Sequence, residues 1–224
     1  MRALFARFRA DASGLTLIES TFIMLLLIAL MVTGTEVQRY FRLARHMTAG
    51  GESLADLMGQ RRAPMRDLNW SEDTSSLVWF VPEVQAGAGA EWRQNIGVQT
   101  TYVRFVPIDP NCTSNCFADR ARILWTWDGG AAGSRRLLTA ASFLRECGGV
   151  LLPGGDGAAR DTLPVALFTG QDLLIVTLVY RFQPRVLNSL FTAKTLLTQA
   201  YLAVPADRLT IDPSGIANEV TPCP

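Results

Sequence analysis

Histidine is the scarcest chemically reactive residue in this chain, since its 224 residues contain only one, His46. The serine and cysteine nucleophiles of hydrolases depend on a histidine as their general base. The sequence also lacks an HExxH motif and a P-loop, and its glycine clusters at 87–89 and 154–157 lack the spacing of a dinucleotide fingerprint. We therefore expect a protein that is not an enzyme and holds no cofactor and no metal.

A charge excess of either sign is missing as well. Lysine and arginine total 21 against 20 aspartates and glutamates, which gives a formal net charge of +1. No long basic stripe is present to follow a phosphate backbone, so nucleic acid is not an expected partner. The acidic residues of the expected loops show no pattern that pairs two carboxylates for glycoside hydrolysis. These residues are Asp109, Asp119, Asp128, Asp156 and Asp161.

Cysteine is sparse but even in number, and all four cysteines follow the apolar segment described below. An even count in an exported domain favours two disulfides. A metal site is less favoured, because CxxC is absent and the histidine is remote in sequence. A local bridge could close the polar loop 112–116 and leave the other two cysteines to pair, although four cysteines allow three connectivities. The cysteines are Cys112, Cys116, Cys147 and Cys223.

One uncharged apolar run lies near the N-terminus. Residues 22–32 carry no charge, and with residues 15–21 they form a helix of about twenty residues, enough to cross a bilayer core of about 30 Å. Glu19 is the exception, since a carboxylate at depth in hydrocarbon costs about 2.5 to 3.5 kcal/mol. It either lies near the headgroups or serves a function. Arginines in the leader place the N-terminus in the cytoplasm, and residues 33–36 make a poor signal-peptidase site, so we expect the anchor to be retained.

The residues around Glu19 resemble a known processing signal. Gly14 is followed by Leu-Thr-Leu-Ile and then Glu19, behind a basic leader and ahead of the apolar helix. This arrangement resembles the class III signal of type IV pilins and pseudopilins. The resemblance implies that a prepilin peptidase cuts between Gly14 and Leu15. It also implies that Glu19, the fifth residue of the mature chain, neutralises the α-amine of a neighbouring subunit as the helices bundle.

Two further stretches look like TadE/TadG-like proteins, the minor pseudopilins of tight-adherence pilus systems. One is the Arg-x-Asp-x-x-Gly-like end of the leader at 9–14, and the other is a C-terminal pair of segments at 176–184 and 198–205. Ser20 follows Glu19, where that family often has an aromatic residue, and Leu-Thr-Leu-Ile-Glu is closer to type II secretion pseudopilins. A type II secretion pseudopilin is therefore an alternative. A membrane-anchored periplasmic binding domain is another, from a different class.

Beyond the apolar run the pattern keeps helical spacing through residue 62. The glycine pair Gly50-Gly51 is expected to be a weak point where this helix kinks or breaks. Eight apolar residues are expected on one side of the helix: Val37, Tyr40, Phe41, Ala44, Met47, Leu54, Leu57 and Met58.

After Pro64 the sequence changes to short β-branched and aromatic runs separated by turns. Strands are expected at 76–81, 100–107, 122–128, 173–182 and 196–204, and residues 135–147 should form a helix, alone or after a short strand. Trp125 and Trp127 share one face of a strand, as half of a core or a sugar-stacking platform, and we favour the core. The predicted fold is α+β, with the leading helix packed on an antiparallel sheet.

The predicted organisation has four parts: a prepilin leader (1–14), a transmembrane helix (15–35), a helix extension (36–62) and a periplasmic α+β domain (63–224). The predicted location is the bacterial inner membrane, with a single crossing, a cytoplasmic N-terminus and a periplasmic C-terminal domain. The expected partners are the prepilin peptidase, other pilin or pseudopilin subunits and the membrane.

Overall fold

The computed structural model describes residues 12–60, 96–109, 111–112, 118–128, 132–154, 159–168, 171–184, 193–204 and 221–222. The expected strand at 76–81 lies outside these residues. The chain divides into two compact units. The first comprises Met1–Arg42 and Gln183–Ala193, and the second comprises Leu43–Phe182 and Lys194–Pro224.

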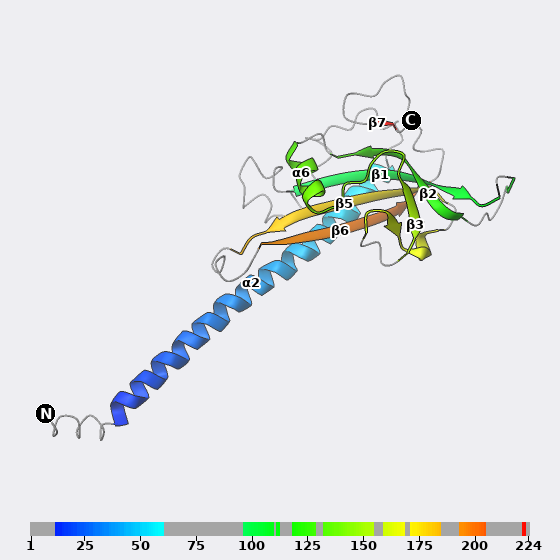
Figure 1. The fold of residues 1–224 in the computed structure, drawn as a ribbon. Coiled ribbons are helices and arrows are strands. Elements are labelled where there is room, and N and C mark those ends of the chain that lie inside the picture. Colours follow the sequence, from blue (N-terminus) through cyan, green and yellow to red (C-terminus); the bar gives the residue numbers. More distant parts are fainter. Residues whose placement is uncertain are drawn as a thin grey trace. The chain divides into compact units, whose positions relative to one another are not determined.

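A single long helix, α2, runs over Ala12–Gln60 for 49 residues (Figure 1). Its length follows from a run of apolar and helix-favouring residues that contains no proline. The expected break at Gly50-Gly51 is absent, because the helix is continuous through both glycines. Both glycines are buried, and this burial accounts for their presence better than a hinge does.

The described strands form one seven-stranded sheet in the order β4-β3-β2-β1-β5-β6, with β7 paired to β2. Their bounds are β1 Ile96–Pro107, β2 Ala118–Trp127, β3 Val150–Pro153, β4 Thr162–Leu163, β5 Leu173–Phe182, β6 Lys194–Ala203 and β7 Thr221–Pro222.

The prediction of an antiparallel sheet is wrong at one edge. The pairs among β1, β2, β5 and β6 are antiparallel, as are those of β3 and β7 with β2. Strand β4, however, pairs with β3 in parallel, with Leu152 opposite Thr162. This parallel pair makes the sheet mixed.

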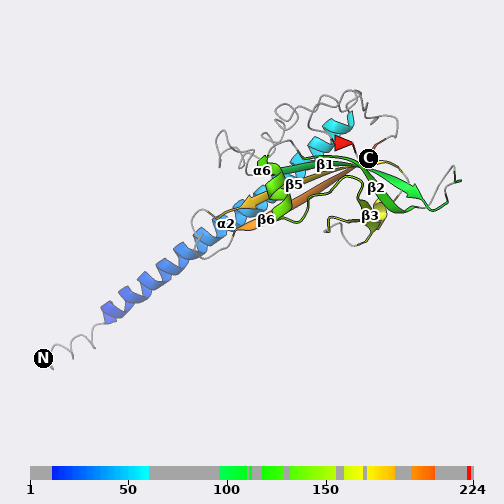
Figure 2. The ribbon, with the colours of Figure 1, turned by 45° about the horizontal axis from the view of Figure 1, so that its top comes forward.

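The two faces of the sheet are covered by different elements of the second unit (Figure 2). Alternation along the strands puts Thr100 and Leu178 on one face, and Gly97 and Thr177 on the other. The first face contacts α2, since Thr100 Oγ1 lies 3.4 Å from Met58 Sδ. The second face contacts the helix α6, Ala132–Ala140, which replaces the expected helix at 135–147.

Helix α2 meets the sheet through a stripe of small and long apolar residues. A Cβ at Gly51 would lie 3.4 Å from Leu178 Cδ1 and 3.6 Å from Ala200 Cβ, which is ordinary contact distance. The buried residues of the stripe are Leu43, Met47, Gly50, Gly51, Leu54, Ala55 and Met58. The expected stripe was therefore correct at Met47, Leu54 and Met58. It was wrong at Val37, Phe41 and Leu57, which are exposed.

Trp125 and Trp127 on β2 are fully buried, and the prediction that they belong to the core is confirmed. Trp125 stacks on Tyr102 of β1, with ring centroids 6.0 Å apart. The Tyr102 hydroxyl donates to the buried carboxylate of Asp172, to which Arg104 also donates at 3.0 Å. Burial, and next the bond to Asp172, raise the pKa of Tyr102 to about 12.

Helix α6 completes the sheet at a point that β2 does not reach. Strand β2 pairs with β1 only from Thr100 onwards, so Val98 has no β2 neighbour. The hydroxyl of Ser134 replaces that neighbour, accepting from Val98 N at 2.8 Å and donating to Val98 O at 3.1 Å. Gly97 permits the approach, since a Cβ there would lie 3.1 Å from Ser134 O. This edge of β1 is therefore satisfied without a strand.

Candidate functional site

The first half of α2 carries the largest exposed apolar surface among the described residues. Ten large apolar side chains between residues 18 and 31 are each 50% to 73% exposed. Because residues 22–28 are consecutive and helical, these side chains surround the helix on every side. They are Ile18, Phe22, Ile23, Met24, Leu25, Leu26, Leu27, Ile28, Leu30 and Met31.

A helix that is apolar all round requires apolar surroundings on every side. Within the described part of the chain, one helix is long and apolar enough to cross a membrane. Its most apolar window of 18 residues lies within Ile18–Gly59, has a mean hydropathy of 1.9 and contains no buried residue. Exposed apolar surface of this extent marks a site of interaction with lipid or protein.

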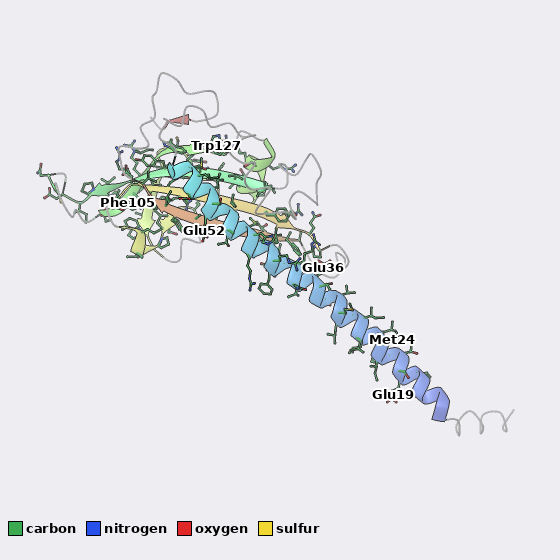
Figure 3. The ribbon with its side chains drawn as sticks, turned by 180° about the vertical axis from the view of Figure 1, so that it is seen from behind. Glu19, Met24, Glu36, Glu52, Phe105 and Trp127 are labelled. Carbon is green, nitrogen blue, oxygen red and sulfur yellow. The ribbon has the colours of Figure 1, made fainter. Side chains whose placement is uncertain are left out.

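Glu19 lies near the start of this surface and is exposed, as is the neighbouring Ser20 (Figure 3). The next acidic or basic residue along the helix is Glu36, so residues 20–35 form an uncharged span of roughly 24 Å. Glu36 is only 8% exposed, and its Oε2 lies 3.4 Å from Arg39 Nη1. Ionisable groups thus mark both ends of the apolar surface. Sequence reasoning identified the first and missed the second.

Two of the three threonines within the uncharged span bond their hydroxyl groups to the helix itself. Thr33 Oγ1 donates to Ala29 O at 2.8 Å, and Thr35 Oγ1 donates to Val32 O at 2.8 Å. Such bonds to the preceding turn leave no hydroxyl donor in need of water. These two threonines are therefore compatible with apolar surroundings.

The predicted processing site lies in the first turns of α2. The helix begins at Ala12, so Gly14 and Leu15 have helical backbone on both sides of the expected cut. Their side chains, and the whole of residues 1–11, lie outside the described residues. Cleavage between Gly14 and Leu15 stays a prediction from the sequence.

Both described cysteines, Cys112 and Cys147, are disulfide-bonded. Cys112 follows β1 in a turn in which its N–H donates to Asp109 O at 3.1 Å, and Cys147 lies between α6 and β3. Cys116 and Cys223 lie outside the described residues, so the pairing inferred for all four stays a prediction.

Three of the acidic residues considered for catalysis have side chains engaged with neighbouring groups, while Asp156 lies outside the described residues. Asp119 pairs with Arg120 at 3.1 Å, and Asp128 pairs with Arg135 at 3.3 Å. Asp109 accepts from the N–H of Asn111 at 2.9 Å. These contacts fix loops and strand ends. Among the described residues, no three histidine, cysteine or acidic side chains lie close enough to hold a metal ion.

Comparison with models of protein families, with curated proteins and with solved structures finds no match to this chain.

Proposed function

We propose that this chain is a membrane-anchored minor pseudopilin of a tight-adherence type pilus system. A prepilin peptidase matures it, and it contributes to pilus biogenesis and adhesion through contacts with other subunits rather than through catalysis. Its N-terminus is cytoplasmic and its C-terminal domain periplasmic, with the first half of α2 crossing the inner membrane before assembly.

The observation that carries this proposal is the combination of an all-round apolar helix with one exposed acid near its start. Lipid satisfies the apolar side chains of the isolated subunit, and the helices of neighbouring subunits do so in a filament. Neither surrounding solvates a lone Glu19 well, so its presence favours a positively charged partner. The α-amine at Leu15, created by cleavage after Gly14, supplies a charge of that sign one helical turn away.

The second half of α2 suggests how assembly of the helix carries the domain with it. Leu54 and Met58 are fully buried against the sheet. The apolar surface belongs to the same continuous helix, so one element contributes both to the domain and to assembly. A helix shared in this way suits a filament subunit. It equally suits a pseudopilin of type II secretion, which is the second candidate.

A membrane-anchored binding domain needs the apolar helix but needs neither Gly14 nor Glu19. Processing therefore tests the proposal. Mass spectrometry of the protein from cells with a working prepilin peptidase should find a mature chain that begins at Leu15. Gly14→Val should leave the precursor uncut, because a side chain at that position blocks the approach of the backbone to the peptidase.

Gly34→Val is the matched control, since a Cβ at Gly34 meets no atom within 4 Å. That variant should be cut as the parent is. Recovery of the parent as an intact chain from Met1, in cells that cleave another prepilin, would favour an uncleaved anchor and reject the pseudopilin assignment.

A further inference from the structure

A polar row crosses the sheet on the face opposite α2. Gln99 of β1 is in register with Thr177 of β5, which is in register with Gln199 of β6. Because partners in register point to the same side, the three polar side chains form a line within a largely apolar layer. The buried apolar residues on that face are Val103, Phe105, Ala121, Ile123, Leu151, Leu163, Leu173 and Ile175.

Arg145 lies over this row and is only 3% exposed. Its main chain makes two bonds with the Gln99 amide: Arg145 N donates to Oε1 at 2.9 Å, and Nε2 donates to Arg145 O at 2.8 Å. The guanidinium donates from Nη1 to Thr177 Oγ1 at 3.3 Å, and from Nε to the carbonyl of Arg160 at 3.0 Å. Both acceptors are neutral, so these bonds do not balance the positive charge.

Burial lowers the pKa of Arg145 to about 10, which still leaves a cation at neutral pH. A buried cation ordinarily has an anionic partner. Among the described residues, no carboxylate accepts a hydrogen bond from Arg145. Within the described residues, the hydrogen bonds of the Arg145 guanidinium therefore leave its positive charge unbalanced.

Two buried donors on this face also lack an acceptor. Arg145 Nη2 has no hydrogen-bond partner. Thr101 Oγ1 also has none, and Thr101 is two residues from Gln99 along β1, on the same face but outside the lining of the cavity beside Arg145. Buried donors are nearly always satisfied in folded proteins, and a missing partner often indicates an ion or water.

A cavity of about 170 Å³ adjoins the arginine, lined in part by Arg145, Gly149 and Arg160. Glu146 and Asp161 also line it, and both are exposed. The volume is below the roughly 300 to 1,000 Å³ of pockets for drug-sized ligands. It is sufficient for a compact ion such as chloride or acetate.

We propose that this cavity is a binding site for a compact monovalent anion, the counter-ion of Arg145. The anion accepts from the guanidinium and balances its charge, which stabilises the layer of loops that covers this face. The site goes beyond the proposed role in assembly and does not depend on it, since every residue involved belongs to the second unit.

The test is thermal unfolding of the full-length chain in neutral detergent. Chloride or acetate replaces gluconate, a larger and more strongly hydrated anion, at constant ionic strength. A bound anion should raise the midpoint temperature along a saturable curve, by roughly 3 to 6 °C at ten times the dissociation constant. Arg145→Gln should abolish this response.

Two exposed neighbours keep the test decisive if Arg145→Gln fails to fold. Arg160→Gln removes a positive charge from the cavity wall and should raise the half-saturating anion concentration about two- to fivefold. Asp161→Asn removes a negative charge and should lower that concentration by a similar factor. Arg120→Gln is the matched control, because its exposed side chain is not part of the cavity wall, and it should change nothing. Equal responses to chloride, acetate and gluconate, or unchanged affinities in both cavity variants, would overturn the proposal and leave water as the occupant.

Discussion

The two halves of α2 are both rich in apolar residues, but they differ in how those residues are arranged and exposed. In residues 18–31 the apolar side chains occupy consecutive positions and are exposed on every side. From Leu43 to Met58 the buried residues recur every three or four positions, and exposed acids such as Glu52 and Asp56 lie between them (Figure 3). A stripe needs one partner surface, and the sheet provides it. An all-round apolar helix needs surroundings that the described residues do not supply, which is the reason for the role in assembly proposed above. The buried second half contributes to the stability of the domain.

Reduction of the disulfides should produce the largest difference between the two regions. Cys112 and Cys147 are both bonded in the second unit, and loss of a native bridge from a small exported domain costs about 2 to 5 kcal/mol. Chemical denaturation with and without reductant should show that loss for the domain, while membrane insertion of α2 stays the same. Thiol labelling of the denatured, non-reduced chain should find no reactive cysteine. Four labelled thiols would contradict the prediction.

One substitution made in both halves should sharpen the comparison. Leu54→Ala removes a side chain that is 1% exposed and should lower the free energy of unfolding by about 2 to 5 kcal/mol. Leu27→Ala removes the same atoms from a side chain that is 58% exposed and should leave domain stability unchanged. Denaturant midpoints of the two variants measure the difference. Equal losses would show that both halves are structural.

The smallest effect is a pH dependence confined to the second unit. The pKa of Tyr102 is raised from 10.0 to about 12, so the folded state holds the phenolic proton more tightly than the unfolded state does. The resulting stabilisation, about 2 to 3 kcal/mol, is complete below pH 10 and is lost as the pH rises to 12.

The pKa of Arg145 is lowered, so its titration raises stability over part of the same range and must be subtracted. The quantity to measure is therefore the difference in unfolding free energy between the parent and Tyr102→Phe, which keeps Arg145. This difference should shrink between pH 10 and 12. A constant difference would show that the hydroxyl acts only through its hydrogen bond to Asp172.

The long elements were predictable because their patterns are local. The apolar run and the helical spacing predicted α2, and the β-branched run at 173–182 coincides with β5. Strand β1 begins at Ile96, four residues before its expected start, because Gly97 and Gln99 weaken the strand pattern. Gly97 lies against α6, and the side chain of Gln99 bonds to the main chain of Arg145. These contacts account for the two residues within the strand.

The features that escaped prediction depend on distant partners. The buried stripe of α2 is centred on Gly50 and Gly51, which a hydrophobic pattern does not count, so the expected face was rotated towards Val37 and Phe41. The short strands β3, β4 and β7 are defined by their neighbours in the sheet rather than by their own two to four residues. Arg145 gave no signal, because an arginine is ordinarily expected to have a solvated side chain, and the expected helix at 135–147 ends at Ala140 in the structure.

The most direct test of the proposed role of α2 is assembly of a Glu19→Gln variant, measured as the amount of protein in filaments sheared from cells relative to that in the membrane. The variant keeps the size and hydrogen bonding of the side chain but removes its charge. Cleavage after Gly14 and membrane insertion should stay normal. The filament fraction should fall, because the α-amine of the neighbouring Leu15 loses its counter-charge in an apolar environment. A filament fraction equal to that of the parent would show that Glu19 is an interfacial residue, and would contradict the assignment of this half of α2 to charge-paired assembly.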